Sequence, residues 1–173
     1  MLSITVGYSS GVVTLLDRTD ARILLALDDE PHATVVALAQ RLGMARNTIQ
    51  TRLRRLEAEG ALSPVTVRVR PEHAGYPVLA FLTLTIDQVD ADRTLADLRE
   101  VPEVCEVHAV TGDGDLLVRV VARDTADLHR ITREVLRCRG VVRSSTAISM
   151  VESVPMRLAP ALSRLAEPPA RRP

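Results

Sequence analysis

The spacing of apolar residues divides the chain into a helical first third and a second half that alternates strands and helices. Between residues 17 and 63, apolar positions recur every three or four residues, which predicts amphipathic helices. The first helix is expected to begin after Asp17, a residue type that caps helix N-termini, and to end before Pro31. A second helix is expected over residues 35–42 and a third over residues 45–59.

Gly43 separates the second and third predicted helices, because glycine adopts the left-handed conformation without steric cost. Two short helices joined by such a turn predict a helix-turn-helix, whose second helix enters the major groove of DNA. Around this turn lie arginines with no acid between them in the sequence, namely Arg41, Arg46, Arg52, Arg54 and Arg55. The alternative, a solvated basic helix face, accounts less well for the turn, the preceding helix and the acid-free run together.

Position along the third helix predicts what each polar side chain does on DNA. Residues near its N-terminus are expected to reach base edges, where arginine and amide groups form paired hydrogen bonds. Residues further along are better placed for phosphates, which orient a protein without reading sequence. The predicted base-reading residues are Arg46, Asn47, Thr48, Gln50 and Thr51. The predicted phosphate contacts are Arg52, Arg54 and Arg55.

The rest of the chain predicts a second, mixed domain. Residues 64–70 alternate in period two, which indicates a short strand acting as a wing or hinge, and residues 71–77 form a turn-rich linker. The order strand, helix, strand, strand, helix, strand follows, and it is typical of a ferredoxin-like α+β domain over residues 78–154. The expected strands are 78–86, 104–110, 116–122 and 141–151, and the expected helices are 92–100 and 125–139. Residues 1–16 are interpreted as a flexible arm or a misassigned translation start, and residues 155–173 as a Pro- and Arg-rich tail.

Both faces of the predicted sheet carry apolar side chains. Leu79 and Phe81 have the opposite parity to the main apolar series of the first strand. Two helices cover only one face, whereas an antiparallel sheet face in water shows polar alternation. A second copy of the chain is the cover that we favour, since two-fold symmetry also pairs two recognition helices on DNA. The alternative cover is the N-terminal domain folded back over the sheet.

Composition argues against several classes of protein. The 173 residues have a formal net charge of zero, which argues against a general nucleic-acid coat protein and for one localised contact. Cys105 and Cys138 form no disulfide framework, and a reduced cytoplasmic protein is the simplest interpretation. The N-terminal residues lack the features of a secretory signal, and no apolar stretch reaches membrane-spanning length, so we expect no membrane partner.

Catalysis has little support in the sequence. The four histidines are scattered, and no glycine-rich loop opens a helix to hold a nucleotide. Cys105 and His108 are three residues apart on a predicted strand, so they point to opposite faces and cannot bind one metal ion together. The sequence therefore predicts no catalytic residues, no metal site and no cofactor.

Several segments in order resemble the leucine-responsive/asparagine-regulator (Lrp/AsnC) family. They are LDRTDARILLAL, ALAQRLGMARNTIQTRLRRLEAEGAL, RPEHAGYP, PEVCEVHAVTGDGDLLVRVVARD and GVVRSSTAIS, and they span about residues 16–154. The resemblance implies an N-terminal winged helix-turn-helix and a C-terminal ferredoxin-like effector domain. It also implies a transcriptional regulator that binds operator DNA as a homodimer, tetramer or octamer and responds to an amino acid or a similar metabolite.

The family resemblance also implies an effector site between subunits, at the turn before the third strand and the start of the last strand. The residues carried over are Thr111, Gly112, Asp113, Gly114, Asp115, Ser144 and Thr146. Backbone N–H groups suit a carboxylate, while Asp115 and the hydroxyls suit an ammonium group. The alternative is that Asp113-Gly114 is only a hairpin turn. The chain departs from the family at two places. Gly114 stands where an aromatic is frequent, so one pocket wall is expected to be missing, and Met44-Ala45 stands where a serine commonly caps the third helix.

Two other functions share parts of this pattern. A sirohaem decarboxylase has the same two-domain plan, but it needs haem-handling histidine or aromatic residues and has no use for an exposed arginine face. A domain that binds amino acids or partner regulators without touching DNA is the third class. The arginine-bearing third helix favours a DNA-binding regulator.

Overall fold

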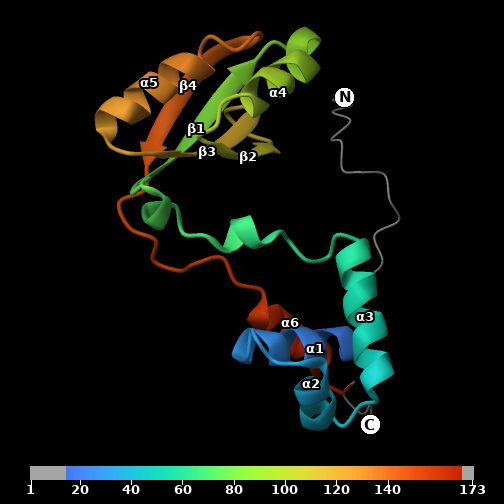
Figure 1. Ribbon diagram of the computed structural model, residues 1–173. Coiled ribbons are helices and arrows are strands. Elements are labelled where there is room, and N and C mark those ends of the chain that lie inside the picture. Colours follow the sequence, from blue (N-terminus) through green and yellow to red (C-terminus); the bar gives the residue numbers. More distant parts are fainter. Residues whose placement is uncertain (1–14, 169–173) are drawn as a thin grey trace, which may run out of the picture. The chain divides into compact units, whose positions relative to one another are not determined.

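The computed structural model describes residues 15–168, which form two compact units (Figure 1). One unit combines residues 15–64 with 154–168, and the other comprises residues 65–153. The chain thus enters the first unit twice. Of the expected N-terminal arm, only Leu15 and Leu16 lie within the described residues.

The first unit contains the three predicted helices, α1 (Arg18–Asp29), α2 (Val35–Leu42) and α3 (Arg46–Ala58). Asp17 caps α1, because its side chain accepts the N–H of Asp20 while the Asp20 side chain accepts the N–H of Asp17. Apolar side chains from all three helices, including Ile23, Leu38 and Ile49, form the buried core. These observations confirm the predicted helices and the Asp17 cap.

A fourth helix corrects the predicted C-terminal tail. Helix α6 (Ala159–Ala166) packs along α1, and Arg18 Nε donates to the Ala166 carbonyl at 2.8 Å. Pro160 lies in the first turn of α6, where a missing N–H costs nothing and the fixed φ suits a helix. Proline near the end of the chain therefore marks a helix start, and the expected tail is wrong over these residues.

The linker also differs from its prediction. Residues 64–70 were expected to form a strand, but Val65–Arg68 is a turn of 3-10 helix, labelled η1, and Pro71–Ala74 is a second one, η2. Alternating side chains make a stable strand only where another strand pairs with it. All four strands of the described residues pair within one sheet that does not include this segment. The valines of η1 are exposed instead.

The second unit has the predicted ferredoxin-like order. Its elements are β1 (Val78–Ile86), η3 (Gln88–Asp90), α4 (Ala91–Arg99), β2 (Val104–Ala109), β3 (Leu116–Ala122), α5 (Thr125–Val135) and β4 (Val141–Ile148). The strands pair antiparallel in the order β2-β3-β1-β4. Helix α5 and strand β4 end four and three residues earlier than the predicted 139 and 151.

Both helices of this unit cover the same face of the sheet (Figure 1). Leu82 and Leu84 of β1 lie opposite Val118 and Leu116 of β3, and all four are buried against α4 and α5. Side chains of the other parity, such as Phe81 at 36% exposure, lie on the face that carries no helix. The predicted one-sided coverage is therefore confirmed.

None of the helices within residues 15–168 is long and apolar enough to cross a membrane.

Candidate nucleic-acid interface and ligand site

One side of α3 is polar and exposed, while the other is buried in the helical core. Ile49 and Leu56 form the buried side. Within the described residues, neither Arg46 nor Arg54 has a hydrogen-bond or ion-pair partner. The exposed predicted residues of this face are Arg46, Asn47, Thr48, Gln50, Thr51 and Arg54. Six of the eight predicted DNA contacts are thus presented to solvent on one helix.

The other two predicted contacts bind acids of α1. Arg52 Nη1 lies 2.5 Å from Asp17 Oδ2 and 2.8 Å from Asp20 Oδ1. Arg55 Nη2 lies 2.5 Å from Asp20 Oδ2, and the Asp20 side chain is fully buried. The geometry corrects the view of a free basic run, because Arg52 and Arg55 join α3 to α1. The acids lie more than thirty residues earlier in the chain, so local sequence gave no signal of the pairing.

These ion pairs shift the ionisation of their members. The hydrogen bond from Arg52 is the main cause that lowers the pKa of Asp17 from 3.8 to about 2. Hydrogen bonds to Asp17 and then Asp20 raise the pKa of Arg52. Arg41, the first arginine of the basic run, pairs in turn with Asp29 and with Glu30. Within residues 15–168, Arg46 and Arg54 are therefore the cations of the run that face solvent unpaired.

The start of α3 has no side-chain cap, as the replacement of the family serine by Met44-Ala45 predicts. Ala45 has extended backbone geometry but offers no side-chain oxygen to the first N–H groups. The Thr48 N–H donates to the Ala45 carbonyl at 3.0 Å, so the N–H groups of Arg46 and Asn47 are the ones left for an anion such as a DNA phosphate.

The predicted ligand turn between β2 and β3 is tied to the end of β1. The N–H of Asp115 donates to the Leu84 carbonyl at 2.8 Å. The Asp115 carboxylate accepts the N–H of Ile86 and the side-chain amide of Gln88, both at 2.9 Å. Asp115 thus holds the turn in place, while Thr111, Gly112 and Asp113 are exposed beyond it.

Gly114 is required by a close approach to β1. A Cβ atom at this position would overlap with Thr83 Cγ2 and would lie 3.1 Å from the Leu84 carbonyl oxygen. An aromatic side chain, which the family resemblance makes the frequent residue here, has no room in this backbone arrangement. The predicted absence of a pocket wall at position 114 therefore has a physical cause in the packing of the turn against β1.

Ser144 and Thr146 lie on β4, on the helix-covered side of the sheet. Their cross-strand partners are Leu84 and Leu82, whose side chains point into the core. The Ser144 hydroxyl is buried without a hydrogen-bond partner among the described residues. Leu84 pairs with Leu116 on its other side, so Ser144 and the turn flank one residue of β1. Thr146 is exposed and lies two residues further from the turn.

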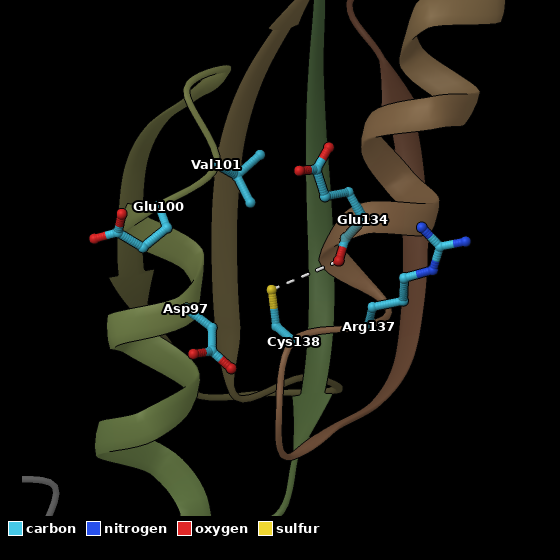
Figure 2. A pocket seen from close by; sticks show the side chains of 6 residues that line it. All are labelled: Asp97, Glu100, Val101, Glu134, Arg137 and Cys138. Atoms are coloured by element: carbon cyan, nitrogen blue, oxygen red, sulfur yellow. Dashed lines mark hydrogen bonds between the residues drawn. The ribbon is translucent and has the colours of Figure 1, made fainter.

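A separate depression of about 250 Å³ lies between the C-terminal ends of α4 and α5 (Figure 2). Its lining residues are Asp97, Glu100, Val101, Glu134, Arg137 and Cys138. Arg139 neutralises Asp97 through paired hydrogen bonds, and burial raises the pKa of the Cys138 thiol. None of these residues belongs to the predicted ligand site, and their distance in sequence hides the depression from local patterns.

Within residues 15–168 no three histidine, cysteine or carboxylate side chains could hold a metal ion together. His108 lies 3.2 Å from Glu106, which also accepts from Arg119 at 2.9 Å. Cys105 and Cys138 are both free thiols.

Known family models match both units. A winged helix-turn-helix DNA-binding model matches residues 16–63, and an Lrp/AsnC ligand binding domain model matches residues 79–158. An uncharacterized HTH-type transcriptional regulator of Pyrococcus horikoshii is 32% identical over 142 residues, covering 79% of this chain and 94% of the relative. This chain belongs to the Lrp/AsnC family. It is a DNA-binding transcriptional regulator with a ligand-binding domain.

Solved structures agree with this regulator fold. AsnC of E. coli superposes with a TM-score of 0.75 at 24% identity, covering 85% of this chain and all of that one. The feast or famine regulatory protein of M. tuberculosis, complexed with L-methionine, has a TM-score of 0.73 at 26% identity, covering 83% and 97%. A Neisseria meningitidis transcriptional regulator, also with L-Met, has a TM-score of 0.72 at 25% identity over the same shares. The sirohaem decarboxylase alternative gains no support from these relatives.

Proposed function

We propose that this Lrp/AsnC regulator reads its operator through the exposed face of α3, and that its affinity for the operator changes when an amino acid binds the sheet unit. The observation that carries the proposal is the unpaired polar face of α3, which presents amide, hydroxyl and guanidinium groups on a helix of the required type. A DNA partner also makes the cytoplasm the expected place of action.

The proposed roles follow position along α3. Arg46, Asn47 and Gln50 lie in its first half, where a recognition helix meets base edges. Arg54 lies about two turns after Arg46 and one turn after Gln50, and it is suited to a phosphate. Thr48 and Thr51 complete the exposed face. Arg52 and Arg55 leave the set of proposed DNA contacts, because α1 already holds their guanidinium groups.

The experiment compares Arg54→Ala with Gln50→Ala on duplexes over a range of salt concentrations. Arg54→Ala should weaken binding to all sequences and reduce the slope of log K against log salt by about 0.9 for each phosphate that the variant no longer neutralises. Gln50→Ala should change preference among sites, since a paired hydrogen bond to a base gives about 1–3 kcal/mol of discrimination. Arg133→Ala, an exposed arginine on α5, is the matched control.

If Arg54→Ala and Gln50→Ala both bind every duplex as the unaltered protein does, α3 is not the DNA-contacting helix.

We propose further that the effector is an amino acid held at the β2–β3 turn. Two related structures contain L-methionine, and the exposed backbone of residues 111–113 suits a carboxylate. The buried, unpartnered hydroxyl of Ser144 beside Leu84 offers a further polar group. Binding should raise the thermal unfolding temperature of the sheet unit in the presence of L-methionine or another amino acid.

The proposed assembly is a homodimer, with tetramers or octamers built from it. Support comes from the helix-free face of the sheet, where Phe81 is exposed and Leu79 and Leu117 are half-buried. A two-fold dimer would present two copies of α3 to neighbouring turns of the operator.

A further inference from the structure

Asp20 is a fully buried carboxylate that holds two arginines of the DNA-contacting helix. Its Oδ1 accepts from Arg52 Nη1 at 2.8 Å, and its Oδ2 accepts from Arg55 Nη2 at 2.5 Å and from the N–H of Asp17 at 3.0 Å. Arg52 also pairs with the Asp17 carboxylate, with Arg52 Nη1 lying 2.5 Å from Asp17 Oδ2. Both arginines keep only about a third or less of their side-chain surface exposed, at 27% and 34%.

The choice of a charged group here is not explained by packing alone. Burying a carboxylate costs free energy that its partners must offset, and an apolar group of similar volume often serves a core equally well. What an acid does at this place, and an apolar residue does not, is to fix the position and neutralise the charge of Arg52 and Arg55. Both residues are on the same helix as the proposed base-reading side chains.

Free cations on a recognition helix favour DNA of any sequence. Non-specific binding is electrostatic, and each phosphate neutralised adds about 0.9 to the salt dependence of affinity on duplex DNA. The useful quantity for a regulator is the ratio of specific to non-specific affinity, because competing sites are numerous. Two additional unpaired arginines on α3 would raise the non-specific affinity without reading a base.

We propose that Asp20 is a specificity-determining residue of this regulator, which withdraws Arg52 and Arg55 from DNA phosphates and so limits non-specific binding. It acts through these two arginines and does not itself contact DNA. The inference rests on the proposed assignment of α3 to DNA.

The test is Asp20→Asn, which keeps the shape and an acceptor for the Asp17 N–H but removes the charge. The probes are a random-sequence duplex and a duplex that the unaltered protein selects from a random pool. The variant should bind the random duplex on the order of tenfold more tightly at low salt, with a salt slope steeper by the equivalent of about one neutralised phosphate per protomer. The gain stays below two because Asp17 still pairs with Arg52 and Glu59 lies 3.9 Å from Arg55. The ratio between the selected and the random duplex should fall accordingly.

Asp28→Asn is the matched control. Asp28 is an exposed acid of the same helix, so its replacement changes the net charge equally without releasing an arginine. It should leave the salt slope as in the unaltered protein. A purely structural role for Asp20 predicts the opposite of the proposal, namely weaker binding to both duplexes with an unsteepened slope.

Arg52→Gln keeps the test decisive if Asp20→Asn does not fold, because Arg55 still neutralises Asp20 in that variant. The proposal expects an unchanged salt slope, since Arg52 does not contact phosphate, whereas a slope reduced by about 0.9 overturns it.

Arg54→Ala separates the two proposals. If Arg54→Ala reduces the salt slope while Asp20→Asn does not steepen it, the proposed role of Asp20 in specificity is wrong, and the assignment of α3 to DNA stands. If Arg54→Ala has no effect, the assignment of α3 fails and the role of Asp20 fails with it.

Discussion

Asp17 has two functions at the first turn of α1. Its Oδ1 accepts the N–H of Asp20, which satisfies a backbone donor at the helix start, and its Oδ2 pairs with Arg52 of α3. The first interaction needs only an acceptor, whereas the second depends on the negative charge. The two contributions can therefore be separated by a substitution that preserves the cap.

Asp17→Asn should preserve the helix cap, because asparagine caps as well as aspartate, and remove the ion pair. The Arg52 hydrogen bond lowers the pKa of Asp17 from 3.8 to about 2, so the charge stabilises the folded state above about pH 4. That contribution is lost as the pH falls from about 4 towards 2. Since Asp17 is half exposed, screening limits the effect at neutral pH to about 1 kcal/mol or less.

Urea unfolding followed by helical circular dichroism at several pH values measures this difference. Other carboxylates with lowered pKa values, such as Asp97 and Asp127, lose stabilisation in the same acid range, so the informative quantity is the difference between Asp17→Asn and the unaltered chain. It should shrink towards zero at low pH. A difference that stays constant from neutral to acid pH would show that the charge of Asp17 does not stabilise the fold.

Among whole elements, those marked by local signals were predictable from the sequence. The Asp17 cap, the Gly43 turn and the apolar runs of β1 and β3 each depend on a few neighbouring residues. Elements that depend on a partner distant in the sequence were not predictable in this way. Residues 64–70 have a strand pattern but no strand beside them, and α6 is a short helix that is stabilised by packing on α1.

The same distinction applies to the candidate sites. The exposed residues of α3 follow from the helical period alone, so Asn47 and Gln50 were identified from sequence. The pairing of Arg52 and Arg55 with Asp20 needs the packed helices, and no periodicity reveals it. The reason for Gly114 is likewise a contact across strands, with Thr83 and Leu84.

Strand β4 offers a test of the proposed ligand site, because adjacent serines point to opposite faces. Ser144 lies opposite Leu84 on the helix-covered side, and Ser145 lies opposite Thr83 on the other. If an amino acid binds at the β2–β3 turn and uses the Ser144 hydroxyl, Ser144→Ala should reduce the rise in unfolding temperature that saturating ligand gives, whereas Ser145→Ala should leave it unchanged.

Thermal unfolding with each amino acid, beginning with L-methionine, provides the measurement. If ligand raises the unfolding temperature of both serine variants equally, Ser144 does not contribute to the site. If no amino acid raises the unfolding temperature of the unaltered protein, the effector is not an amino acid.

At the scale of the whole molecule, the two faces of the sheet have different surroundings. The face with Leu82 and Leu84 is sealed by α4 and α5, while the face with Phe81 carries no helix. Across the strands, Phe81 pairs with Arg119 of β3 and Ala147 of β4. A second copy packed on this face would bury Phe81 in both protomers at once, because a two-fold interface uses the same patch twice.

Phe81→Asp should therefore weaken the dimer by at least about tenfold, since two carboxylates would be buried in one interface and the neighbouring Arg119 of each protomer is already paired with Glu106. Because each duplex would then be bound by single α3 helices, operator affinity should fall as well. Val89→Asp is the control, since Val89 is 92% exposed and lies on η3, outside the strands of the sheet. Sedimentation equilibrium over a range of concentrations gives the association constants, and unchanged thermal unfolding of the dissociated protomer shows that the sheet itself is intact. A Phe81→Asp protein that associates as strongly as Val89→Asp would exclude this face as the dimer interface, and another surface would then have to bring the two recognition helices together.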